Sequence, residues 1–274
     1  MAKNKSRIDD AMLDHVRMTM ERSRGGAAPK EGSPEEFKAQ DLYYEAMETG
    51  DMDLIYDALE IDPGSVDCLL QFLYAFDGDS LEGLQFAQQI VKIAEKRLGK
   101  KMFKECKGHF WGMLETRPYM RARSELAQRL LKMGQIDESI VEHEGMLELC
   151  PGDNLGIRYG LVGLYLQQNR LTDAARLLKE FEDERPYSAM MAWPYVLERF
   201  LSGALDEAAE ALSVAREQNG YVEAYLNGHR NLPKESAGSY SPGSREEAEI
   251  CADLQKPAWD AHPESIEWLE ASKK

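Results

Sequence analysis

The sequence predicts an all-α fold, a right-handed solenoid of stacked helical hairpins, and three observations predict it. One six-residue motif occurs three times, and its copies begin 35 and 34 positions apart. The copies are 134–139 (Gly-Gln-Ile-Asp-Glu-Ser), 169–174 (Asn-Arg-Leu-Thr-Asp-Ala) and 203–208 (Gly-Ala-Leu-Asp-Glu-Ala). Proline recurs with nearly the same period, at Pro118, Pro151 and Pro186. No segment alternates between apolar and polar residues for long enough to be a strand. A period of about 34 residues is typical of helix–turn–helix repeats.

Each copy of the motif begins with a residue that suits a turn between two helices. These residues are Gly134, Asn169 and Gly203, and all three types tolerate a positive φ. A helix is therefore expected to end before each copy and another to begin within it. Neither helix of such a pair buries its apolar stripe alone, so neighbouring pairs stack into a superhelix with a concave face.

Residues 118–220 resemble tetratricopeptide repeats. That family packs two antiparallel helices per repeat and places small residues where the helices cross. In the first repeat these positions hold Ala127 and Ser139. In the second and third repeats Ala174 and Ala208 keep the pattern, whereas Val162 and Val196 depart from it, which implies a slightly wider crossing.

The remaining chain divides into three further segments. Residues 1–33 form an N-terminal arm, expected to be either a short docking helix or a partly disordered tail. Residues 34–117 form a divergent helical-hairpin region, which includes helices expected near 80–98 and 100–115. Residues 221–274 form a C-terminal capping extension with a helix that starts at the capping box of Ser244.

Three further motifs lie between 105 and 270. They are 108–112 (Gly-His-Phe-Trp-Gly), 115–122 (Glu-Thr-Arg-Pro-Tyr-Met-Arg-Ala) and 240–244 (Tyr-Ser-Pro-Gly-Ser). This part of the chain is similar to a group of uncharacterised, mostly bacterial repeat proteins and resembles the suppressor-of-tumorigenicity-7-like family. The resemblance implies a helical interaction protein and supplies no reaction.

Composition favours a cytoplasmic protein without a membrane span. Hydrophobic residues make up 43% of the chain, but no apolar run approaches the roughly 18 residues of a spanning helix. The N-terminal residues are polar and lack the apolar segment of a secretory signal. Four cysteines lie far apart without a C-x-x-C motif, which predicts reduced thiols.

The net charge of −16 makes nucleic acid an unlikely partner. Residues 92–132 are locally basic, with 12 Lys/Arg against 4 Asp/Glu. This segment is interpreted as a solvated basic face, and an RNA-contacting surface is the alternative.

The concave face is the predicted binding site, because repeats of this family direct fixed positions of each first helix into the groove. The resemblance places a partner protein or peptide against eight residues: Arg121, Gln128, Lys132, Tyr159, Leu166, Trp193, Leu197 and Phe200. An exposed strip as apolar and aromatic as the third repeat is typical of a peptide-binding or helix-binding surface. The alternative is that the chain's own segment 228–243 fills the groove.

Two smaller hypotheses concern the junction before the first repeat. Arg117, Arg121 and Arg123 are candidates for holding a carboxylate or phosphate, unless they pair with acids of the protein itself. A pocket around His109, Arg117 and Tyr119 is the basis of the alternative function, an enzyme or small-ligand binder. It requires these side chains to converge around a cavity.

No signature of catalysis is found in the sequence. There is no G-x-S-x-G, no H-E-x-x-H, no phosphate-binding loop and no G-x-G-x-x-G. The sequence therefore predicts a non-catalytic protein–protein interaction scaffold, without a cofactor or a metal site.

Overall fold

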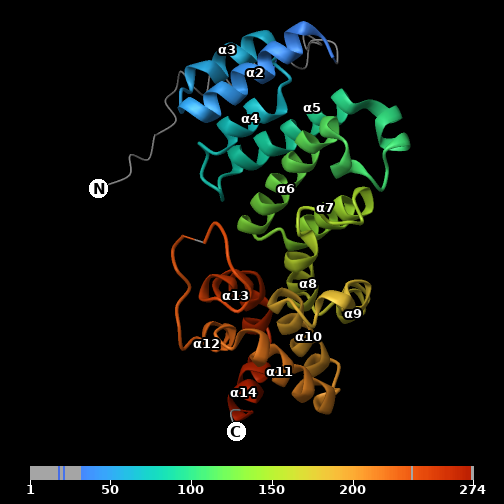
Figure 1. Ribbon diagram of the computed structural model, residues 1–274, viewed down its shortest axis with the longest axis vertical. Helices are drawn as coiled ribbons and strands as arrows, with labels where there is room; N and C mark the ends of the chain where they lie inside the picture. The colour runs from blue at the N-terminus through green and yellow to red at the C-terminus, as the bar shows by residue number, and fades with distance from the viewer. Residues whose placement is uncertain (1–17, 19–20, 22–31, 236, 273–274) are drawn as a thin grey trace. The chain divides into compact units, whose positions relative to one another are not determined.

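The computed structural model describes residues 18, 21, 32–235 and 237–272, and every regular element within them is a helix (Figure 1). The predicted all-α class is confirmed. The predicted N-terminal arm, 1–33, lies almost entirely outside the described residues. None of the described helices is both long and apolar enough to cross a membrane.

The chain forms two compact units, Met1–Gly152 and Asp153–Lys274. The division falls after the first predicted repeat. Packing explains this position: α6 of the first repeat packs on α5 before it, whereas α8 and α10 of the later repeats pack on α13 after them. The structure therefore groups the helices differently from the predicted ranges 34–117, 118–220 and 221–274.

From residue 32 on, the described part of the first unit opens with a capped helical hairpin. Ser33 accepts a hydrogen bond from the Glu36 amide at the start of α2, and Gly50 ends that helix with φ 75°. Within 32–152 the helices are α2 (Pro34–Thr49), α3 (Asp53–Ile61), α4 (Val66–Leu73), α5 (Leu81–Glu105), α6 (Arg117–Lys132) and α7 (Ile136–Leu149), with short 3-10 helices η1 (Phe110–Gly112) and η2 (Leu114–Thr116).

An ion-pair cluster built around one buried carboxylate ties α5 to the hairpin. Arg97 of α5 contacts Glu36 of α2 and lies 2.7 Å from the carboxylate of Asp62, which is buried just after α3. The two carboxylates raise the pKa of Arg97 even though burial opposes its charged form. Because buried charges are costly without partners, this cluster specifies how α5 sits on α2 and α3.

The predicted helix at 100–115 is wrong beyond Glu105. The chain takes φ 65° at Gly99 and φ 89° at Gly108, two conformations that favour glycine and break a continuous helix. Two 3-10 turns replace the helix, and Thr116 donates a hydrogen bond to the carbonyl of Met113, 2.9 Å away, as α6 begins.

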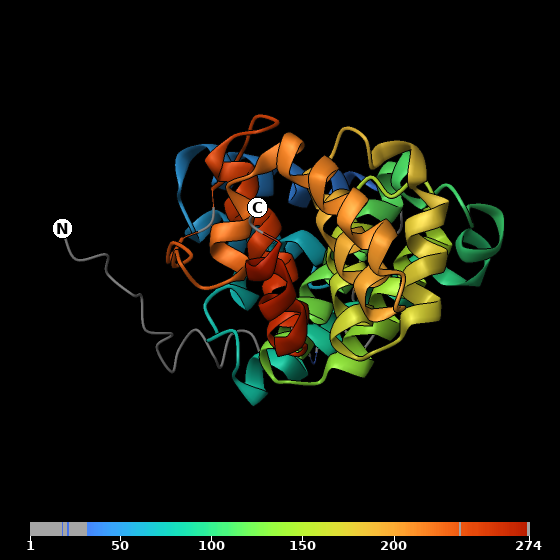
Figure 2. The same cartoon turned by 90° about the horizontal axis from the view of Figure 1, so that it is seen from below.

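The second unit contains the second and third predicted repeats and the C-terminal extension. Its helices are α8 (Ile157–Gln167), α9 (Leu171–Glu180), α10 (Ala189–Leu201), α11 (Leu205–Asn219), α12 (Val222–Leu226), α13 (Arg245–Asp260) and α14 (Pro263–Ala271), with the 3-10 helix η3 (Glu182–Glu184). The helix predicted from the Ser244 capping box is confirmed, since Ser244 accepts from the Glu247 amide. Within this unit α13 packs against α8, α10 and α12, and Figures 1 and 2 show it beside these helices.

Candidate functional site

The predicted groove of the second and third repeats is covered by helices of the same chain. Leu166, Trp193 and Leu197 are fully buried. The ring of Trp193 meets that of Trp259 on α13 edge to face, with centroids 6.5 Å apart. Phe200 is half-buried and stacks on Trp268 of α14, at 5.1 Å. These side chains therefore form a core rather than an open binding surface.

Polar contacts fix α13 and α14 in this position. The Gln255 Nε2 donates to the carbonyl of Tyr159, 2.7 Å away, and the His262 Nε2 lies 2.9 Å from the carbonyl of Leu166. Tyr159 is itself half-buried: its hydroxyl donates to Glu184, and the Arg158 guanidinium lies over its ring. Burial, with the nearby Glu184 charge, raises the pKa of Tyr159 to about 12.

The expectation of an open groove is thus corrected for this unit, and so is the alternative that 228–243 fills it. The covering elements are α13 and α14, while 228–243 is mostly exposed. Burial of apolar surface explains why α13 covers the groove, because this helix contributes the fully buried Trp259, Cys251, Ala252 and Ala258. The large apolar side chains of 228–243 are less buried, because Leu232 is partly exposed and Tyr240 is 45% exposed.

The space around two glycines of α8 shows how closely α13 packs against that helix. A Cβ on Gly163 would lie 2.7 Å from the Leu254 carbonyl oxygen, whereas a Cβ on Gly160 would meet only a Leu254 methyl group, at 3.8 Å. We expect Gly163→Ala to lower the free energy of unfolding by about 1–2 kcal/mol, because overpacking outweighs the gain in helix propensity. Gly160→Ala, on the same helix, is expected to be neutral or to stabilise by up to about 1 kcal/mol. Urea titrations of both variants check this, and equal effects would contradict the close packing.

The groove positions of the first repeat lie in the first unit and differ in exposure. Gln128 and Lys132 are exposed, but Arg121 pairs with the buried Asp67 of α4 through three hydrogen bonds, from Nε at 3.0 Å and from Nη2 at 2.7 and 2.8 Å. A bidentate pair of this kind holds the guanidinium strongly. Arg121 therefore connects α6 to α4.

The other two arginines of the predicted anion contact also have partners within the protein. Arg123 lies 2.6 Å from Glu142 of α7, and Arg117 donates to the carbonyl of Trp111 and lies over the Trp111 ring. The alternative of internal pairing is therefore the one that the structure supports. An added anion would have to compete with these contacts.

The predicted pocket around His109, Arg117 and Tyr119 does not gather these side chains into one constellation. His109 is exposed, while Tyr119 is buried and packs against Phe103 and Phe110. Burial raises the pKa of the Tyr119 hydroxyl, which disfavours its use as a base. Arg117 is held at Trp111 instead of pointing to Tyr119.

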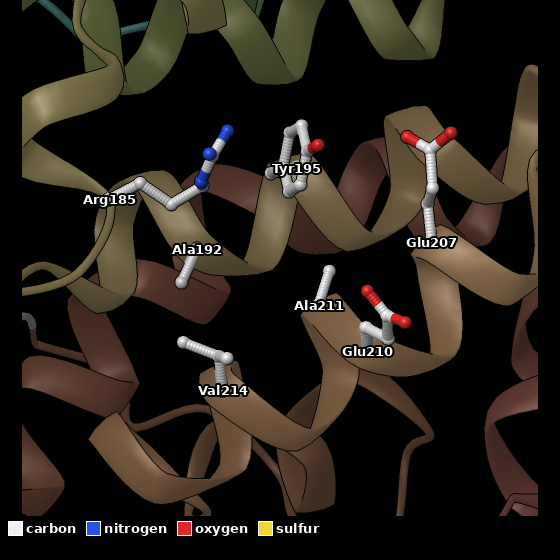
Figure 3. Close-up of a pocket in the computed structure, with 7 residues that line it drawn as sticks. All are labelled: Arg185, Ala192, Tyr195, Glu207, Glu210, Ala211 and Val214. Atoms are coloured by element: carbon white, nitrogen blue, oxygen red, sulfur yellow. The ribbon is translucent and has the colours of Figure 1, made fainter.

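A cleft of about 330 Å³ lies between α10 and α11 in the second unit (Figure 3). Arg185, Ala192 and Tyr195 line it from the α10 side, and Glu207, Glu210, Ala211 and Val214 line it from α11. No residue of α13 or α14 contributes to its lining. The cleft is therefore distinct from the face that the C-terminal helices cover.

Charged groups are held around Tyr195 at this cleft. The Arg185 guanidinium lies 3.9 Å from the centre of the Tyr195 ring, and that of Arg199 lies 5.5 Å from it. Arg199 also pairs with the buried Glu198 and with Glu207, and these contacts, Glu198 first, raise its pKa. Arg199 and Glu207 are thus neutralised by one another and by their neighbours.

Sequence reasoning missed the cleft because it used only the groove-facing positions of α10. The available signal was weak: Ala192 and Ala211 are small residues on two facing helices, and Val214 is an exposed apolar residue on a charged helix face. Such a pattern is common in surface helices. Only the packing of α10 on α11 makes it a cleft.

The described residues contain no group of three or more His, Cys, Asp or Glu side chains placed to hold a metal ion. The four cysteines are free thiols, three of them buried. Comparison of the chain with protein-family models and with curated proteins gave no match. The likeness to tetratricopeptide and suppressor-of-tumorigenicity-7-like proteins accordingly stays a resemblance of motifs.

Proposed function

We propose that this chain is a non-catalytic, tetratricopeptide-like interaction protein that binds a peptide or helix of a partner protein at the α10–α11 cleft. The groove predicted for this role is filled by α13 and α14 in the second unit. The binding surface is therefore assigned to the cleft, which those helices leave open.

The observation that carries the proposal is the chemistry of the cleft. Ala192, Ala211 and Val214 are apolar, and Val214 is 45% exposed. Arg185, Glu207 and Glu210 place charges around this apolar surface. An apolar surface with a charged rim is the usual composition of a protein–protein contact. The resemblance to interaction repeats and the reduced thiols expected of a cytoplasmic protein support the same role.

A peptide selection tests the proposal without knowledge of the partner. A random 12-residue peptide library is displayed on phage and selected against the full chain, and the enriched peptides are titrated by fluorescence polarisation. We expect Val214→Arg to weaken their binding at least about tenfold, because the new side chain fills the cleft and replaces an apolar contact.

Ser213→Arg is the matched control, since Ser213 is the exposed neighbour of Val214 on α11 and does not line the cleft. Both variants must keep the thermal melt of the wild type. Enrichment no greater than on an unrelated helical protein, or equal binding by both variants, would remove the cleft from this role.

A further inference from the structure

Arg185 presents hydrogen-bond donors that the protein does not use. Its guanidinium lies over the Tyr195 ring, and no described residue accepts a hydrogen bond from it. The backbone of Arg185 is held in place, because its carbonyl accepts from Gln218 Nε2 at 2.6 Å. A guanidinium held by stacking loses little conformational freedom when it binds a carboxylate, so this side chain is prepared for an anionic group.

Glu210 provides the opposite charge. Glu207 already pairs with Arg199, at 3.2 Å, whereas no described residue donates a hydrogen bond to the Glu210 carboxylate or pairs with it. Figure 3 shows the Arg185 guanidinium and Glu210 on opposite sides of the cleft, with Ala211 between them and with Ala192 and Val214 below the Arg185 side chain. The unpaired charges are thus separated by an apolar strip.

From this arrangement we infer that the cleft recognises a dipolar segment of a partner protein: an acidic side chain at Arg185, an apolar side chain over Ala192 and Val214, and a lysine or arginine at Glu210. The inference rests on the proposed function and adds the order of charges in the partner. Charge complementarity selects this occupant, since a purely basic segment would face Arg185 and a purely acidic one would face Glu210.

Charge reversal at each end tests the order. The peptide selection is repeated on full-length Glu210→Lys and Arg185→Glu. Glu217→Lys, at an exposed position of α11 outside the cleft, is the control with the same charge change as Glu210→Lys. Peptides selected by the wild type should contain an acidic and a basic residue, and should bind either cleft variant about tenfold more weakly but bind the control normally.

Compensating peptides separate charge recognition from damage to the fold. Replacing the peptide's basic residue by glutamate should restore binding to Glu210→Lys, and replacing its acidic residue by lysine should restore binding to Arg185→Glu. Peptides that are lost on Val214→Arg yet are insensitive to both reversals overturn this inference and leave the proposed function standing. An empty selection overturns both. Sedimentation of the wild type shows whether the chain associates with itself. If it does, and if either charge reversal abolishes the association, the occupant of the cleft is a second copy of this chain, and the inference of a different partner protein is overturned.

Discussion

Replacing Trp259 with alanine is expected to lower the free energy of unfolding of the second unit by about 3–5 kcal/mol. Trp259 is fully buried on α13, and its ring packs edge to face on Trp193 of α10. Removing the indole leaves a large cavity between two helices that are far apart in sequence, and the surrounding side chains recover only part of the lost contact. Urea denaturation followed by circular dichroism at 222 nm measures the change.

The control is Tyr240→Ala, in the segment that precedes α13. Tyr240 is 45% exposed, so its loss is expected to change stability by less than about 0.5 kcal/mol. A loss below about 1 kcal/mol for Trp259→Ala would show that α13 is a loosely docked tail. That result would support the prediction that a partner binds the concave face, because a partner could displace the helix that covers Trp193 and Leu197.

Arg129→Met is expected to destabilise the first unit by about 2–3 kcal/mol. Arg129 is 95% buried on α6, where its guanidinium donates to the carbonyl of Asp77, 2.9 Å away, and to that of Leu73 at the end of α4. Burial lowers its pKa, but these carbonyls provide the acceptors that a buried cation needs. Methionine keeps the apolar stem and leaves the carbonyls without their donor.

Gln128→Met is the matched control for this second prediction, since Gln128 is the exposed neighbour of Arg129 on the same helix. It should change stability by less than about 0.5 kcal/mol. Comparable midpoints for the two variants in urea would mean that the Arg129 contacts contribute nothing net. In that case the cost of burying the charge would equal the gain from its hydrogen bonds.

The helices themselves were predictable from local signals. Serine at 33 and 244, each followed three residues later by glutamate, marks two helix starts that the structure confirms, because capping depends only on residues within one turn. The turn glycines at 134 and 203 take the positive φ expected of them, and so does Asn169. Sequence patterns also predicted helices at α8 and α10 with apolar concave faces, which were expected either to bind a partner or to be filled by 228–243.

The tertiary structure alone decided what covers those faces. Trp193 and Trp259 are 66 positions apart, and Arg121 and Asp67 are 54 apart. Many helices in this chain carry an apolar stripe, so periodicity shows that a stripe needs a partner without showing which helix provides it. The cleft also depends on tertiary packing. Tyr195 and Val214 are residue types common on helix surfaces, and they line a cleft only because α10 packs against α11. Each helix is determined by residues that are close together in the sequence, so the helices can be predicted from the sequence. The candidate site depends on contacts between distant segments, which only the folded chain brings together.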